Sequence, residues 1–172
     1  EYYRKPSEGM NEGITSNYLD YVPFIQIIGD GLPSYLSGLW TSLMSYDIYR
    51  AEFVAYEIIF QYNVTGYELA KIHNGLANLA YSSNADERTL EFVARHGLKA
   101  YELKDYYFKN DDCIRLDFFW STLCNVLKKL NRLDEAIEIA TFAANNDAYD
   151  KTKGGWPARL EKLIKAKEKS SK

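Results

Sequence analysis

Histidine and cysteine are scarce in this chain, and the short motifs of common catalytic sites are missing. Its 172 residues include 2 His and 2 Cys, too few for the clusters of His and Cys ligands that hold zinc. There is also no phosphate-binding glycine loop, no zincin motif, no CxxC pair and no Gly-x-Ser-x-Gly elbow. We therefore expect a chain without metal or cofactor and without catalytic activity of its own.

Proline and long apolar runs are also missing from most of the chain. None of the 4 prolines lies between Ser34 and Trp156; they are Pro6, Pro23, Pro33 and Pro157. An all-β chain of this length needs many turns rich in glycine and proline, so the long interval favours helices. No apolar run approaches the roughly 18 residues of a membrane span, and we expect none.

Apolar residues recur with the period of an α-helix. The first such stripe has offsets of 0, 3, 7, 10 and 14 and consists of Ile48, Ala51, Ala55, Ile58 and Tyr62. Similar stripes follow along the chain, which predicts an all-α fold: an α-α superhelix of stacked antiparallel helix hairpins. The expected helices lie near 34–46, 47–62, 67–82, 86–107, 112–130, 134–146 and 157–169.

Polar and proline residues mark the expected helix starts. Asp86, Asp112 and Asp134 stand where a side chain can accept hydrogen bonds from the free N–H groups of a first turn. Pro157 suits the first turn of the last helix, where a missing N–H group costs nothing.

The chain divides into two expected parts. Residues 1–33 are rich in glycine and proline and carry no sustained stripe, which predicts an irregular N-terminal segment. Residues 34–169 form the helical repeat domain, closed by a C-terminal capping helix near 157–169. Because the first residue is Glu1 and not Met, we expect a processed mature form or a fragment of a larger protein.

The cysteines bear on the compartment. Cys113 and Cys124 are eleven residues apart, which separates them by about 16 Å on one helix. They cannot then form a disulfide, and unbridged thiols favour an intracellular location. A mature secreted form stays open, because a signal peptide could have been removed and Asn63-Val64-Thr65 is a glycosylation sequon.

A repeat signature occupies residues 117–150. The sequence reads Trp120-x2-Leu123-Cys124-x2-Leu127, then Ala136-x3-Ala140-x2-Ala143, with Asn131-Arg132 between the two halves. This pattern resembles the tetratricopeptide repeat (TPR), a helix–turn–helix of 34 residues. A looser version covers residues 69–103. Two positions depart from the pattern: Ala140 replaces a large aromatic residue, and Ala148 replaces a proline.

The resemblance implies packing roles for the residues of the repeat. Trp120 would lock the first helix, and Cys124 would be the small residue at the tightest helix crossing. Ala136 and Ala143 would let the second helix pack closely. Asn131-Arg132 would form the turn between the helices.

The same resemblance implies a binding surface. In TPR proteins the first helix of each repeat lines a concave face, and some members clamp a terminal carboxylate of a peptide with Lys and Asn. Asn125 lies five residues after Trp120, where the Asn of such a clamp stands, although Ser121 occupies the place usual for Lys. The candidate groove residues are Lys71, Asn78, Asn125 and Lys128.

The two histidines have ordinary structural interpretations. His73 stands where the looser repeat would have its Trp, so we interpret it as a packing residue. His96 neighbours the small residues Ala94 and Gly97, and we expect a surface or partly buried side chain. A cluster of aromatic residues follows on the same expected helix and predicts a lid, a dock or a contact with the next repeat: Tyr101, Tyr106, Tyr107 and Phe108.

The charge of the chain is uneven. Residues 151–172 hold eight bases and two acids, a net charge of +6, whereas the other 150 residues carry −9. We expect Arg159, Lys162 and Lys165 to form a basic outer face on the capping helix. This face is either a solvated cap or a contact for an acidic partner.

These observations favour a non-catalytic protein–protein interaction module that binds a peptide or helix of a partner. The alternative is an accessory or scaffold domain of a larger enzyme or assembly. Contact with nucleic acid through the basic end ranks third, because only Trp156 supplies an aromatic side chain there.

Overall fold

The computed structural model describes residues 48–61, 63–83, 86–110 and 115–170. Within these ranges the fold is all-α and no strand is present. The helices are α3 (Ile48–Gln61), α4 (Gly66–Ser83), α5 (Glu87–Glu102), α6 (Trp120–Lys129), α7 (Leu133–Asn145) and α8 (Gly155–Ser170). Two short 3-10 turns, η2 (Lys104–Tyr106) and η3 (Asp117–Phe119), join α5 to α6.

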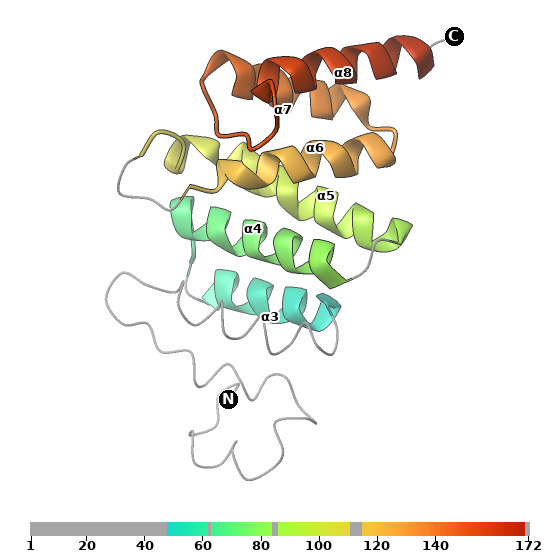
Figure 1. The fold of residues 1–172 in the computed structure, drawn as a ribbon. Coiled ribbons are helices and arrows are strands. Elements are labelled where there is room, and N and C mark those ends of the chain that lie inside the picture. The colour runs from blue at the N-terminus through green and yellow to red at the C-terminus, as the bar shows by residue number, and fades with distance from the viewer. Residues whose placement is uncertain (1–47, 62, 84–85, 111–114, 171–172) are drawn as a thin grey trace.

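The helices stack one on another in chain order, from α3 at one end to α8 at the other (Figure 1). Successive helices run antiparallel, and each packs mainly on its neighbours in the sequence. The helix pairs are therefore compatible with a helical-repeat fold. The expected segment 1–33 and the expected helix 34–46 lie outside the described residues.

Small residues form the helix crossings. The completely buried alanines are Ala51, Ala55, Ala70, Ala77, Ala80, Ala94, Ala136, Ala140 and Ala143. Between α5 and α6, a Cβ added at Gly97 would lie 2.6 Å from Cδ1 of Leu123. Between α6 and α7, the Cys124 thiol donates to the carbonyl oxygen of Ala136 at 3.5 Å. Cys124 and Ala136 are thus buried in contact with each other where α6 meets α7.

An aromatic cluster joins the α4–α5 pair to the α6–α7 pair. Its rings lie 5.2 to 6.2 Å apart between centroids and belong to Tyr101, Tyr107, Phe108, Trp120 and Phe142. The indole Nε1 of Trp120 donates to the Tyr107 hydroxyl at 3.1 Å, and that hydroxyl donates to the carbonyl oxygen of Ala100 at 3.0 Å. Of the three roles expected for this segment, contact with the next helix pair is the one found.

This cluster also explains why two expected helices are shorter. The helix expected over 86–107 ends at Glu102, because the chain must turn through η2 to bring Tyr107 onto Trp120. The helix expected over 112–130 begins at Trp120, after η3. In η3, buried Asp117 accepts hydrogen bonds from Arg115 and from the N–H of Tyr149, which fixes the entry to α6.

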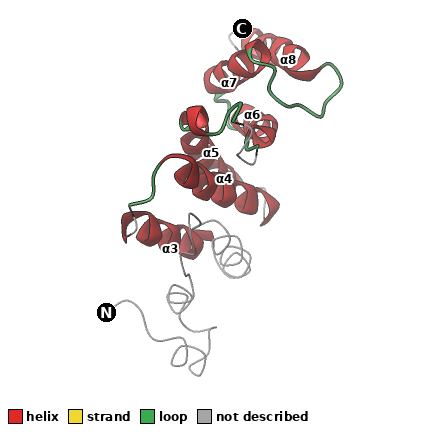
Figure 2. Cartoon of the chain, turned by 90° about the vertical axis from the view of Figure 1, so that its left-hand side faces the viewer, coloured by secondary structure: helices red, strands yellow, loops and turns green. Residues whose placement is uncertain are grey.

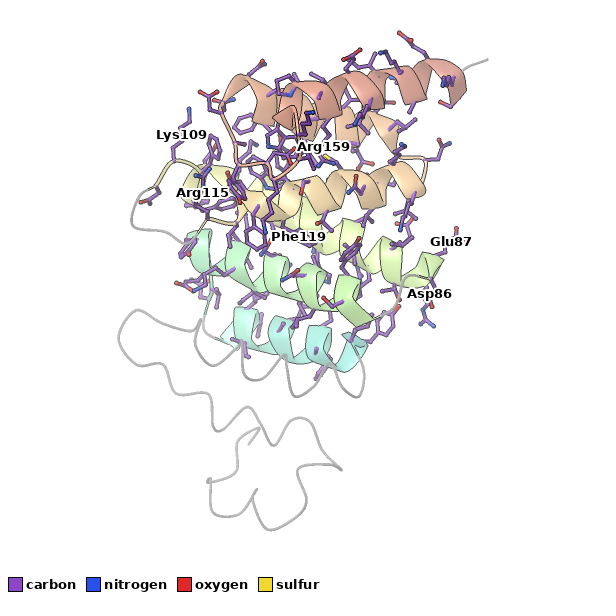
Figure 3. All side chains as sticks on the ribbon, viewed as in Figure 1. Asp86, Glu87, Lys109, Arg115, Phe119 and Arg159 are labelled. Atoms are coloured by element: carbon purple, nitrogen blue, oxygen red, sulfur yellow. The ribbon has the colours of Figure 1, made fainter. Side chains whose placement is uncertain are left out.

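Of the aspartates expected to cap helix N-termini, one does so in the structure. Asp86 caps α5 by accepting the N–H of Thr89 at 2.7 Å, as predicted (Figure 3). Asp134 does not cap α7, because that helix already begins at Leu133 and Asp134 lies in its first turn. Asp112 lies outside the described residues.

The turn between α6 and α7 needs a residue in the left-handed region. Asn131 has φ of 58°, and its N–H donates to the carbonyl oxygen of Lys128. The N–H of Arg132 donates to the carbonyl oxygen of Leu127 at 2.8 Å, which completes a Schellman motif. Residues of the same conformation follow α3 and α7: Asn63 (φ 50°) and Asp147 (φ 54°).

The last helix packs on α7 and closes the stack. Pro157 lies in its first turn, as expected. Trp156 and Leu163 are buried, and the Trp156 Nε1 donates to the carbonyl oxygen of Tyr149 at 3.1 Å. Ile164 on the same helix is 41% exposed. Among the described helices, none is both long and apolar enough to cross a bilayer.

The crossing of α5 and α6 can be tested with Gly97→Ala. In an open helix this change stabilises by about 0.5–1 kcal/mol. Here the new methyl group would lie 2.6 Å from the side chain of Leu123, which is completely buried and must shift to admit it. We therefore expect a net loss of about 1–3 kcal/mol in the free energy of unfolding, measured by urea denaturation.

Leu123→Ala supplies the control, since it opens space for the added methyl group. Gly97→Ala should cost less in the Leu123→Ala background than in the unchanged chain. Equal costs in both backgrounds would contradict the close crossing.

Candidate functional site

The expected groove residues come from two helices of the stack. Lys71 and Asn78 lie on α4, and Asn125 and Lys128 lie on α6. Asn78, Asn125 and Lys128 are exposed, whereas Lys71 is half-buried with its ammonium 5.3 Å from the ring centroid of Tyr67. Both helices pack on α5, which lies between them in the stack.

One of these residues meets the basic C-terminal helix. A hollow of about 270 Å³ lies between α6 and α8, and Asn125, Arg159 and Lys162 line it. The side-chain oxygen of Asn125 accepts from the Arg159 guanidinium at 3.1 Å. The structure thus brings together a residue of the expected groove and two of the expected basic face.

Arg159 differs from the exposed cation expected on α8. Its guanidinium lies 3.1 Å from the carboxylate of Asp150, and the two side chains are only 13% and 2% exposed. The pair ties the α7–α8 loop to α8, on which Figure 3 labels Arg159. The exposed basic face of α8 is therefore made by Lys162 and Lys165 without Arg159.

The only two histidines of the sequence contact each other inside the stack. Nδ1 of His73 on α4 lies 2.9 Å from Nδ1 of His96 on α5. Nε2 of His96 lies 2.9 Å from a carboxylate oxygen of Glu52 on α3, which also pairs with Arg95 at 2.8 Å. His96 is 0% exposed and His73 is 4% exposed, so His96 is not the surface or partly buried residue expected.

The proton positions in this chain of contacts follow from its geometry. The Glu52 carboxylate accepts a hydrogen bond, so Nε2 of His96 must donate. A neutral His96 then has an acceptor at Nδ1, and His73 must donate from its own Nδ1. Two neutral imidazoles in fixed tautomers thus link α3, α4 and α5.

Burial keeps both rings neutral. It lowers the pKa of His73 to about 3, and the adjacent His96 ring and the positive charges of Lys99 and Arg95 lower it further. Burial also lowers the pKa of His96 to about 3, together with Arg95 and Lys99. The buried Cys124 thiol has its pKa raised to about 12, again chiefly by burial. These groups therefore act as packing groups with satisfied hydrogen bonds and not as bases or nucleophiles near neutral pH.

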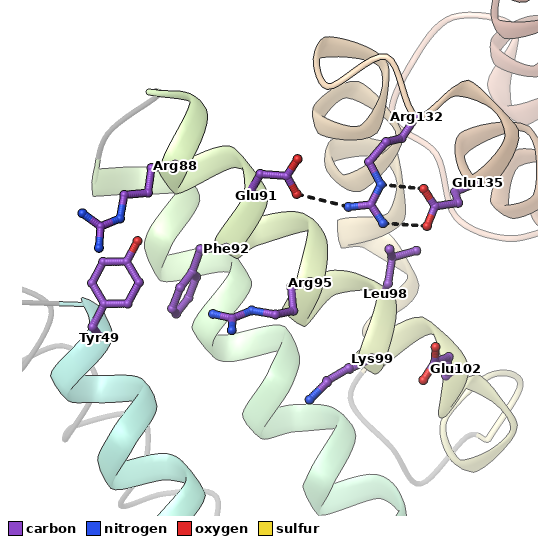
Figure 4. Close-up of a pocket in the computed structure, with 10 residues that line it drawn as sticks. All are labelled: Tyr49, Arg88, Glu91, Phe92, Arg95, Leu98, Lys99, Glu102, Arg132 and Glu135. Atoms are coloured by element: carbon purple, nitrogen blue, oxygen red, sulfur yellow. Dashed lines mark hydrogen bonds and ion pairs between the residues drawn. The ribbon is translucent and has the colours of Figure 1, made fainter.

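A second feature lies outside, on the face shared by α3, α5 and α7. Residues from these helices and from the turn before α7 line a hollow of about 670 Å³ (Figure 4). Along α5 this hollow carries Arg88, Arg95 and Lys99, which we call the basic stripe. At 100° per residue these three positions fall within about 40° of one another around the helix.

Each cation of the basic stripe lies over an aromatic ring. The Arg88 guanidinium is 4.7 Å from the ring centroid of Tyr49, and that of Arg95 is 5.3 Å from the centroid of Phe92. The Lys99 ammonium lies 5.2 Å from the ring centroid of Tyr56 and donates to the Tyr56 hydroxyl at 2.8 Å. Figure 4 shows Arg88, Arg95 and Lys99 pointing to the α3 side of α5.

The opposite edge of the hollow is acidic and internally paired. The Arg132 guanidinium donates twice to Glu135 at 2.6 Å and once to Glu91 at 3.3 Å (Figure 4). These bonds connect the start of α7 to α5.

Comparison with known proteins adds no relationship. No family model matches the chain, and neither the curated proteins nor the solved structures give a significant match.

The histidine pair predicts a pH dependence of stability. An unfolded imidazole takes up a proton near pH 6.5, whereas the folded rings stay neutral down to about pH 3. The unfolded state therefore binds more protons in this window, and stability falls as the pH drops below 6.5. Each histidine contributes up to about 1.4 kcal/mol per pH unit, to be measured by urea unfolding between pH 6.5 and 5.

The control is the double variant His73→Gln/His96→Gln. It should be less stable than the unchanged chain at pH 7.5, but its stability should vary little over the same interval. A slope equal to that of the unchanged chain would show that other groups cause the pH dependence.

Proposed function

We propose that this chain is a non-catalytic protein–protein interaction module that binds a peptide or a helix of a partner along its helical stack. The proposal rests on a contrast between the interior of the protein, where the histidines and the described cysteine are neutral, and its surface, which is polar and aromatic. The imidazoles and the described thiol are buried and held in neutral forms. Long polar and aromatic side chains remain on the outside of the helices.

The finer proposal is that α6 and α7 form a TPR-like unit. Supporting it, the signature residues of this pair are all buried: Trp120, Leu123, Cys124, Ala136 and Ala143. Asn131 forms the turn in a left-handed conformation. Completely buried Ala140 lies where TPR proteins have a large aromatic side chain, and Phe142 on the same helix fills the aromatic cluster instead.

In this proposal the first helices of the pairs, α4 and α6, carry the contact surface. Asn78 on α4 and Lys128 on α6 are exposed, so each of the two helices presents a polar group to a ligand. Asn125 is already bonded to Arg159, so a ligand at Asn125 would also meet Arg159 in the hollow between α6 and α8.

Photo-crosslinking tests this proposal without knowledge of the partner. A benzophenone amino acid placed at Asn78 or at Lys128, in cells that naturally contain the protein, should capture the same partner from both positions. The control position is Glu168, which is exposed on α8. Lys128→Glu should weaken the interaction by roughly tenfold, because it reverses a charge at the contact. No adduct, or an identical set of adducts from all three positions, would contradict the proposed surface.

A further inference from the structure

The basic stripe on α5 has charge that the fold does not use. Arg95 is paired with Glu52, but no described carboxylate lies within ion-pair distance of Arg88 or Lys99. Arg88 is exposed and Lys99 is half-buried. Of the three cations of the stripe, two are therefore available to an external anion.

We propose that the basic stripe is a binding site for an acidic peptide segment of a partner protein. The site goes beyond the interaction surface proposed on α4 and α6, since it lies on α3, α5 and α7. The crosslinking test of the α4 and α6 surface and the binding test of the basic stripe can therefore fail independently of each other.

The spacing of the cations fits carboxylates on a short segment. Arg88 and Lys99 are eleven residues apart, about 16 Å along the helix axis. Five residues of an extended segment span about the same 16 Å. A bound segment of ordinary length thus reaches both ends of the stripe.

The aromatic rings prepare the cations for binding. Arg88 lies over Tyr49 and Lys99 lies over Tyr56, so these long side chains are ordered before a ligand arrives. Binding therefore loses less rotamer entropy than it would with free surface lysines. The rings and half-buried Leu98 also offer apolar surface to the aliphatic parts of a peptide.

The borders of the hollow favour a peptide over a nucleic acid. Glu91, Glu102 and Glu135 line its other edge. A nucleic acid places a phosphate at every nucleotide and would meet these carboxylates with like charge. A peptide with interspersed acidic residues can place its carboxylates on the stripe and its neutral or basic groups beside the glutamates.

The test measures binding of fluorescent poly-L-glutamate of about 20 residues to the full chain at low salt. Arg88→Glu/Lys99→Glu should weaken binding at least about tenfold, and affinity should fall with added salt. The matched control is Lys151→Glu/Lys169→Glu, which makes the same change in net charge at two exposed lysines outside the hollows and should leave binding unchanged. Arg88→Gln/Lys99→Gln, a milder pair checked for helical content, should also weaken binding.

Four results would overturn the inference. They are no binding to the unchanged chain, equal weakening by both charge reversals, weakening by the control reversal alone, and displacement by inorganic polyphosphate at lower charge concentration than by poly-L-glutamate. The last result would make the stripe a phosphate site. A loss of binding by the two α5 variants alone supports the acidic-peptide site.

Discussion

Close approach of the helices is the constraint on which the rest of the structure depends. A stack in which each helix packs on the next has only one or two faces per helix in which to bury apolar area. Completely buried alanines such as Ala94 and Ala136 accordingly share the core with larger apolar side chains, and Gly97 admits the side chain of Leu123 between α5 and α6. At this same junction between helix pairs, large rings pack around Trp120.

Close packing also requires the polar residues of the interior to form hydrogen bonds with one another. His73 and His96 are buried at the α4–α5 crossing, where an unpaired imidazole nitrogen would carry a desolvation cost of about 1–3 kcal/mol. The two rings offset this cost by hydrogen bonding to each other, and the Nε2–H group of His96 donates a hydrogen bond to the Glu52 carboxylate. Glu52 in turn pairs with Arg95, which belongs to the basic stripe. The buried histidine pair is therefore connected through Glu52 to a residue of the stripe.

The helices and their packing faces could be predicted from local periodicity, since stripes such as Ala51, Ala55 and Ile58 are visible in the sequence. The ends of α5 and the start of α6 could not, because they depend on Tyr107 meeting Trp120 across a turn. The histidine pair joins residues 23 apart, and Glu52 joins His96 from 44 residues away. No local pattern signals such contacts. The basic stripe is different: Arg88, Arg95 and Lys99 recur at helical spacing and could have been found from the sequence.

The two basic regions of the chain differ in how their charges are held. On α8 Lys165 pairs with Glu161 of the same helix, and such exposed pairs contribute little to stability. On α5 Arg95 is paired with Glu52, but Arg88 and Lys99 lie over rings and beside no described carboxylate, so the charge of these two is oriented without being neutralised. At physiological salt, charges more than about 8 Å away are largely screened. The acidic balance of the rest of the chain therefore does not cancel the local field of the stripe, and a ligand docked on α5 experiences mainly the cations that it touches.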